Sequence, residues 1–398
     1  MNINYKHTLF ACFVGYIVQA IVNNFVPLLF LTFQDSYGIS YAKITLLISI
    51  NFGVQLVIDL LSAFFIDRIG YRKSAVIAHA FSIVGLVGLA LLPDIFPDPF
   101  WGLVTTVTLY AVGGGLLEVL ISPIVEACPT DNKEKAMSLL HSFYCWGHVG
   151  VVLLSTLFFT VFGIENWRVI ALIWAVIPAA NLILFLRVPI NSLIPEDEIG
   201  MKPSALLKNK LFYIMFLLML CAGASEQGVS QWASAFAEAG LGVSKSLGDL
   251  AGPMLFAILM GTARAVYGKF GHKIDLEKFM LFSSVLCVGA YLLTALSPNP
   301  VFSLIGCGIC GFSVGILWPG TFSLACAGIK GGGTLMFALF ALAGDIGCAT
   351  GPAVVGNAAE LLGGRLNLGI LCGIIFPALM TGGLLLYRLS KKRAEKQS

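Results

Sequence analysis

Long apolar runs, each about the length of one membrane crossing, follow one another along almost the whole chain. A transmembrane helix needs about 20 mostly apolar residues to cross a hydrocarbon core of about 30 Å. The runs predict helices at 9–33, 41–66, 75–92, 100–126, 137–162, 167–188, 211–236, 246–267, 279–296, 302–327, 334–358 and 366–389. The pattern therefore predicts an all-α membrane protein with twelve transmembrane helices and little chain left for a soluble domain.

The longest polar stretch between these runs covers residues 189–210. It carries prolines and charges of both signs, which is typical of a linker. Because six apolar runs precede it and six follow it, we predict three parts: an N-terminal six-helix bundle at 1–188, a cytoplasmic linker at 189–210 and a C-terminal six-helix bundle at 211–398.

The two halves of the sequence resemble each other. The segment Gly115–Pro123 matches Gly311–Pro319, 196 residues later, with glycine and proline in register. A second match, 197 residues apart, pairs Phe143, Gly147 and Gly150 with Phe340, Gly344 and Gly347. A chance match of small residues is the alternative. A true repeat predicts two pseudo-symmetric bundles with the solute site between them, near the bilayer midplane.

The basic residues fall mainly on one side of the predicted membrane. With a cytoplasmic N-terminus, 20 of the 24 Lys and Arg residues lie in cytoplasmic segments, and only Lys43, Arg168, Lys245 and Arg365 lie outside. Cytoplasmic loops of membrane proteins carry such an excess of Lys and Arg. We therefore predict a multi-pass protein of the bacterial cytoplasmic (inner) membrane with both termini in the cytoplasm.

Composition supports a membrane protein and argues against other classes. Hydrophobic residues make up 58% of the chain and charged residues 11%, against about 25% charged in an average soluble domain. The formal net charge of +3 is small and spread over short loops, so we expect no nucleic-acid partner. The sequence has no H-E-x-x-H, G-x-S-x-G or Walker A motif, so we expect no enzymatic activity and no cofactor. The ten cysteines lie almost entirely inside apolar runs, and we expect no metal site.

A short charged loop follows the second predicted helix. It reads D-R-I-G-Y-R-K over residues 67–73, and a degenerate copy, G-K-F-G-H-K, follows the eighth helix at 268–273. The arrangement of six helices, a linker and six more helices, together with this loop, resembles that of the major facilitator superfamily over the full length of the chain. The resemblance implies the major facilitator fold, alternating access and a cytoplasmic gate. By that resemblance the gating residues are Asp67, Arg68, Gly70 and Arg72. The alternative is an ordinary cytoplasmic turn whose basic residues only follow the positive-inside rule and have no role in gating.

Glu118 is the strongest candidate among the ionisable side chains inside predicted helices, each of which costs roughly 2.5 to 3.5 kcal/mol to insert. Its context, G-G-G-L-L-E-V-L-I-S-P, resembles the G-x-L-E-x-x-x-N-P stretch of the fucose/proton symporter branch. The resemblance implies a glutamate that contacts sugar and takes part in proton coupling. This sequence differs from that branch at two points, which leaves open whether the proton passes between two acidic residues. Ser122 replaces the asparagine, and helix 1 has Gln19, Asn23 and Asn24 where the branch has an acidic residue.

Amides and aromatic rings in other predicted helices suit a polyhydroxylated ligand. Amides both donate and accept hydrogen bonds, and flat rings stack on the apolar face of a sugar. Gln19 and Asn23 lie four residues apart on helix 1. Helices 7 and 10 add the candidates Glu226, Gln227, Gln231, Trp232 and Trp318. Polar faces of this kind can equally hold helices together, so both interpretations stay open.

Two histidines, His141 and His148, lie on one stripe of the fifth helix, and His148 is the repeat partner of Asp345 in helix 11. A contact between His148 and Asp345 would open and close with the alternating halves or with proton binding. The alternative for a lone intramembrane histidine is packing.

These patterns predict a secondary active transporter. The leading hypothesis is uptake of a sugar, polyol or similar small polar solute, with a proton as a possible coupling ion. The alternative is efflux of drugs or metabolites by proton antiport, which the same scaffold performs. We expect a monomer whose partners are its solute, the coupling ion and the lipid bilayer.

Overall fold

The computed structural model describes the chain apart from residues 1–3, 130–132, 192–202, 271–273, 330–332 and 396–398, and apart from some side chains inside helices. Within the described residues all regular structure is helical, and no strand is present. Twelve helical segments of this part of the chain are long and apolar enough to cross a membrane. The predicted all-α architecture with twelve spans is therefore confirmed.

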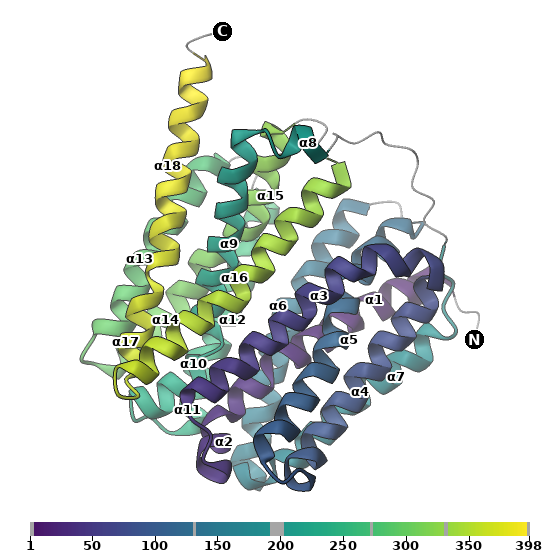
Figure 1. Cartoon of the computed structure of the whole chain (residues 1–398), viewed down its shortest axis with the longest axis vertical. Helices are drawn as coiled ribbons and strands as arrows, with labels where there is room; N and C mark the ends of the chain where they lie inside the picture. Colours follow the sequence, from purple (N-terminus) through teal and green to yellow (C-terminus); the bar gives the residue numbers. More distant parts are fainter. Residues whose placement is uncertain (1–3, 130–132, 192–202, 271–273, 330–332, 396–398) are drawn as a thin grey trace. The chain divides into compact units, whose positions relative to one another are not determined.

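Several of the spans consist of more than one helix (Figure 1). The first half of the chain contains α1 (Tyr5–Asn24), α2 (Phe30–Tyr37), α3 (Tyr41–Ile69), α4 (Tyr71–Ile95), α5 (Pro99–Ala127), α6 (Lys133–Phe162) and α7 (Trp167–Phe185). The second half contains α8 (Pro203–Leu206), α9 (Lys210–Ser230), α10 (Ala233–Ala235), α11 (Lys245–Asp249), α12 (Leu255–Phe270), α13 (Leu276–Leu296), α14 (Pro300–Val314), α15 (Leu317–Gly328), α16 (Gly333–Leu361), α17 (Leu366–Gly373) and α18 (Ile375–Glu395).

Prolines explain most of the breaks within spans. Pro27 lies in a short 3-10 turn between α1 and α2, and Pro253 lies in a π turn between α11 and α12. Pro319 and Pro377 each occupy the first turn of a new helix, α15 and α18. Proline has no backbone N–H to donate, so it is tolerated where a helix begins and interrupts one that continues. The twelve predicted spans are present, and at these prolines four of them divide into shorter helices.

Helix contacts divide the chain into two compact units. Unit 1 comprises residues 1–194 and 243–250, and unit 2 comprises residues 195–242 and 251–398. The division after residue 194 falls inside the predicted linker, half of which (192–202) lies outside the described residues. Residues 243–250 depart from the predicted bundles: they belong by sequence to the second half but pack with unit 1.

Glycines on α5 bring three helices of unit 1 together. A Cβ at Gly113 would meet the backbone of α4 at Ala78, and a Cβ at Gly115 would lie 3.0 Å from the Cα atom of Gln55 in α3. Small residues at such points allow helix backbones to approach closely in a membrane. As a result α5 packs against both α3 and α4.

The glycines of the predicted repeat occupy equivalent contacts in the two units. Gly115 of α5 packs on α3, and its partner Gly311 of α14 packs on α12. A Cβ on Gly147 of α6 would meet α1, and the carbonyl of its partner Gly344 in α16 lies against Gly223 of α9. The match between the halves of the sequence therefore has a physical basis in helix packing within each unit.

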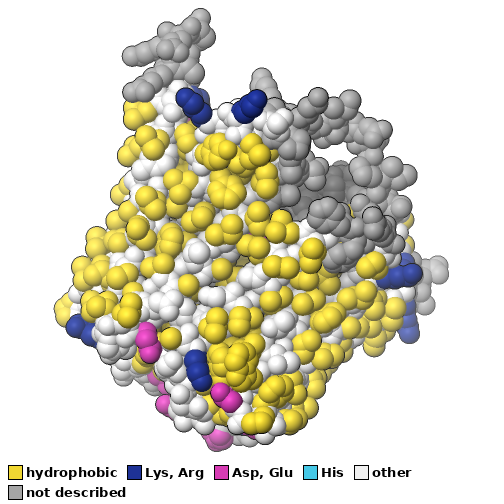
Figure 2. All heavy atoms as spheres, in the orientation of Figure 1, with side chains coloured by type: hydrophobic (Ala, Val, Ile, Leu, Met, Phe, Trp, Pro, Cys, Tyr) yellow, Lys and Arg dark blue, Asp and Glu magenta, His cyan; other side chains and the backbone are white. Residues whose placement is uncertain are grey.

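Apolar side chains cover most of the described surface on the face drawn in Figure 2. Many large hydrophobic residues are more than half exposed, among them Phe10, Val161 and Val301. Such a surface is unfavourable in water and suits contact with lipid. The lysines and arginines visible on this face lie towards the ends of the helices.

Candidate solute and cation site

Glu118 of α5 lies against α1 in unit 1, beside Gln19, another of the predicted site residues. The Gln19 Nε2 atom donates a hydrogen bond to Glu118 Oε2 at 2.7 Å. One turn away, the Tyr16 and Ser122 hydroxyls lie 3.0 Å apart. The close approach occurs at Gly15, where an added Cβ would lie 2.8 Å from Ile121. Two of the predicted site residues therefore meet directly.

Asn23 joins two polar residues that the sequence analysis missed. Its Oδ1 atom accepts hydrogen bonds from Asn51 Nδ2 at 3.1 Å and from Gln55 Nε2 at 2.9 Å, both in α3. All three side chains are buried. The signal that would have found them is spacing: Asn51, Gln55 and Asp59 recur every four residues and so share one face of the helix.

Asp59 of α3 places a second carboxylate beside Glu118. Carboxylate oxygens of the two side chains lie within 4.8 Å of each other. Two ionised carboxylates at that separation repel by roughly 3 to 4 kcal/mol at an effective dielectric constant of about 20. This part of unit 1 therefore favours the presence of a positive charge or a proton.

The histidines have different surroundings. His148 is 3% exposed in α6. His79, a further ionisable residue within a predicted helix, is buried between the Ala75 carbonyl at 2.7 Å and the Asn181 amide at 2.8 Å, which is a packing arrangement. The side chain of His141 lies outside the described residues. The predicted contact of His148 with Asp345 would join the two units and stays a prediction.

Unit 2 contains a second polar cluster, on α9. Gln231 donates to the Gln227 Oε1 atom at 2.9 Å, and Gln227 donates to Glu226 Oε1 at 3.2 Å. Arg264 of α12, which the sequence analysis did not single out, lies 3.4 Å from Glu226 Oε2 and donates to the Gly315 carbonyl at 3.3 Å. The predicted residues Glu226, Gln227 and Gln231 therefore form a continuous series of hydrogen bonds, and the Arg264 guanidinium offsets the charge of the Glu226 carboxylate.

The two predicted tryptophans contact neighbouring helices of unit 2. Trp232 is fully buried, and its indole Nε1 donates to the Pro352 carbonyl at 3.0 Å. The ring of Trp318 packs where a Cβ on Gly344 would lie. Asp345, the residue after that glycine, is 6% exposed in α16. Packing accounts for both rings in this conformation, and their predicted contact with a solute is untested.

The predicted gating loop begins at the sharp turn between α3 and α4. Gly70 has φ of +89°, a conformation that favours glycine. Arg72 donates to the carbonyls of Phe185 at 2.9 Å and Val188 at 2.7 Å, at the end of α7. A cation at a helix C-terminus offsets unpaired carbonyls there. The side chains of Asp67 and Arg68 lie outside the described residues.

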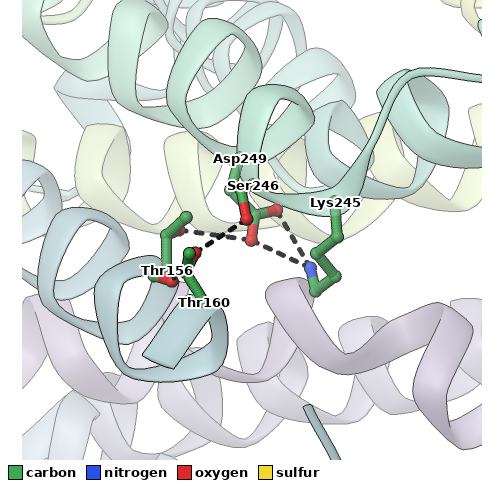
Figure 3. A network of polar contacts seen from close by, with 5 residues as sticks. All are labelled: Thr156, Thr160, Lys245, Ser246 and Asp249. Carbon is green, nitrogen blue, oxygen red and sulfur yellow. Dashed lines mark hydrogen bonds and ion pairs between the residues drawn. The ribbon is translucent and has the colours of Figure 1, made fainter. Parts of the chain in front are cut away.

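A further polar network fastens residues 243–250 to α6 within unit 1 (Figure 3). Lys245 Nζ lies 3.0 Å from both carboxylate oxygens of Asp249, whose side chain is 1% exposed. Thr156 of α6 donates to Asp249 Oδ2 at 3.3 Å, and the hydroxyls of Thr160 and Ser246 lie 2.8 Å apart. Thr156 and Thr160 thus hold residues 243–250 on α6, and the Lys245–Asp249 ion pair lies within that segment.

Comparison with known proteins gives a family and a fold. The family model described as Major Facilitator Superfamily matches residues 8–352. A crystal structure of a single-residue variant of the E. coli fucose:proton symporter FucP has a TM-score of 0.64 and 14% sequence identity, covering 95% of this chain and 98% of that chain. That similarity concerns the fold alone. None of the curated protein sequences matches the chain. Because the family model matches most of its length, the chain belongs to the major facilitator superfamily, with a fold resembling that of the fucose symporter branch.

Proposed function

We propose that this transporter takes up a sugar, polyol or similar small polar solute by alternating access, with a proton as the coupling ion. The observation that carries the proposal is the polar wall of unit 1, where Gln19 binds Glu118 and Asn23 gathers two further amides. Amides that donate and accept, beside a carboxylate, suit a ligand rich in hydroxyl groups. The fold of a known fucose:proton symporter supports the same class of solute.

The proposal places the protein in a bacterial inner membrane as a monomer with both termini in the cytoplasm. The support is the distribution of Lys and Arg, of which 20 of 24 fall on one side of the predicted membrane. Twelve membrane-spanning segments, an even number, are consistent with termini on the same side.

Transport by the purified protein in liposomes tests the proposal. The assay offers labelled neutral sugars and polyols, and in parallel a cationic dye, with and without an inward proton gradient. We expect at least one sugar or polyol to accumulate only with the gradient. Glu118→Gln should abolish that accumulation, because the amide cannot take up and release the proton. Glu360→Gln, which changes an exposed carboxylate at the end of α16, is the matched control and should leave accumulation intact.

Efflux by proton antiport is the rival outcome of the same assay. Extrusion of the dye in the absence of any sugar or polyol uptake would overturn the proposal in favour of efflux. Equal accumulation by the wild type and Glu118→Gln would support the proposed solute class but contradict the role of Glu118 in proton coupling.

A further inference from the structure

Unit 2 contains a cavity of about 220 Å³. Its lining comes from a π turn at Phe236–Gly240, from the connection between α13 and α14, and from Asn367 of α17. These parts lie in contact, because α17 packs against both α13 and the π turn. Phe236 and Thr294 are the most deeply buried residues of the lining and form the floor of the cavity. Pockets for drug-sized ligands measure roughly 300 to 1,000 Å³, so this one suits a smaller molecule.

The π turn shapes one wall of the cavity. The Leu241 backbone N–H donates to the Phe236 carbonyl, five residues earlier, at 3.1 Å. Gly240 allows this turn to close over the Phe236 ring, because a Cβ at Gly240 would lie only 2.7 Å from a carbon atom of that ring. Turns of this kind are rare within helices and are frequently found at functional sites. The ring supplies an apolar, aromatic surface at the floor of the cavity.

The C-terminal end of α13 supplies the polar wall. The last carbonyl groups of a helix have no partner within it. Ala295 and Ser297 both line the cavity, and their carbonyls accept long hydrogen bonds, one from Asn367 Nδ2 and one from the Ser303 hydroxyl, each at 3.5 Å. Hydrogen bonds in proteins usually measure about 2.5 to 3.2 Å between heavy atoms. These carbonyls and the Asn367 amide can therefore form shorter bonds with a ligand.

The charge of the lining restricts the class of ligand. No Asp, Glu, Lys, Arg or His side chain lines the cavity among the described residues. An ion bound there would lose part of its hydration without gaining a charged partner, which is unfavourable. A neutral molecule with several hydroxyl groups fits better, because hydroxyls donate to carbonyl oxygens and accept from an amide.

We propose that this cavity is a second solute site, which binds one small sugar or polyol through the carbonyls of Ala295 and Ser297 and the amide of Asn367. The inference rests on the proposed function for the class of solute, but its residues are separate from Gln19 and Glu118. The distribution of Lys and Arg predicts that this end of unit 2 lies outside the cell. A solute bound there is held at the outer face before it is transported.

Protection of an introduced cysteine from a charged maleimide tests the site. Ser297→Cys places a thiol in the lining, in a Cys372→Ser background that removes an exposed native thiol. The purified protein is placed in lipid nanodiscs, which leave both faces accessible, and is labelled with and without glycerol, sorbitol or fucose. We expect at least one of the three to slow labelling at least fivefold. Glu165→Cys, an exposed position between α6 and α7, is the control and should not be protected.

Equal labelling rates of Ser297→Cys with and without all three compounds would overturn the proposal. A second substitution distinguishes binding in the cavity from binding elsewhere. Asn367→Leu, added to Ser297→Cys, should remove the protection, because the amide that binds the solute is lost. The matched control is Asn357→Leu, whose exposed amide bonds only the Ala353 carbonyl of its own helix, and it should keep the protection. Protection that survives Asn367→Leu would show that the solute acts from another site and would also overturn the proposal.

Transport kinetics then connect the cavity with uptake. In liposomes, Asn367→Leu should raise the KM for the transported sugar or polyol several-fold at unchanged kcat, because capture at the outer face is weakened while the later steps remain. An unchanged KM would contradict a role of the cavity in capture. If the wild type transports no sugar or polyol, the proposed function fails, while the labelling experiment still decides whether the cavity binds one.

Discussion

The ionisable side chains buried in this protein are paired in different ways, and the pairing decides what each can do. Glu226 lies beside Arg264, and Asp249 lies beside Lys245, so both carboxylates have a cation as a neighbour. Glu118 has an amide and a second carboxylate beside it. A cation beside a buried carboxylate offsets its charge, whereas two neighbouring carboxylates repel each other.

The Lys245–Asp249 pair should therefore be essential for stability. Lys245→Met leaves the nearly fully buried Asp249 carboxylate without its cation, and breaking such a pair costs about 3 to 5 kcal/mol. We expect a clear fall in the melting temperature of the purified protein in detergent. Lys245→Met combined with Asp249→Leu should recover most of it, because no buried charge then remains.

The matched control is Lys43→Met. Lys43 lies 3.8 Å from Asp98, and both side chains are about half exposed, so the loss of this surface pair should change stability little. Equal melting temperatures for Lys245→Met and Lys43→Met would contradict the structural role of the buried pair.

At the scale of elements, glycines set how closely helices approach and therefore which polar side chains meet. Gly115 brings α5 against α3, and Gly311 brings α14 against α12 at the equivalent position of the repeat. The polar pairs Asp59–Glu118 and Glu226–Arg264 involve these same helices or their neighbours. Helix packing and the chemistry of the site are thus determined by the same small residues.

Enlarging these glycines should disturb both units in the same way. Gly115→Ala and Gly311→Ala each place a Cβ against the backbone of a neighbouring helix, and overpacking of this kind typically costs about 1 to 3 kcal/mol. We expect both variants to melt at lower temperature. Gly53→Ala and Gly289→Ala are controls inside α3 and α13, because an added Cβ there has no neighbour within 4 Å. Equal behaviour of all four variants would refute the packing argument.

At the scale of the whole molecule, the apolar surface and the charge distribution determine the environment and the topology. Twelve spans and the apolar side chains on the face drawn in Figure 2 suit a membrane. The excess of Lys and Arg in alternate loops then favours one orientation, because positively charged loops remain in the cytoplasm.

Reporter fusions in a bacterial host test this orientation. A green fluorescent protein at the C-terminus should be fluorescent, and alkaline phosphatase at the same position should be inactive, because the C-terminus is expected in the cytoplasm. An epitope inserted in the turn at Gly363 and Gly364 should be accessible to antibody from outside. The opposite pattern of the three reporters would show that the orientation is inverted.

The sequence by itself determined the number of spans, the division into halves and the family resemblance. These follow from local physics: a membrane helix requires a long apolar run, and a proline or a charged loop acts on the residues next to it. The same reasoning singled out Glu118, since a lone carboxylate in an apolar helix is conspicuous, and it named Gln19 as a candidate on helix 1.

Only the tertiary structure decided which polar side chains face one another. Asp59 meets Glu118, Asn51 and Gln55 meet Asn23, and Arg264 meets Glu226, and in each case the partners lie on different helices far apart in sequence. Such meetings depend on the rotation and register of packed helices, which small residues such as Gly115 set through three-dimensional contact. A pattern read along one helix contains no information about its neighbour, and the proximity of Asp59 to Glu118 is therefore visible only in the folded protein.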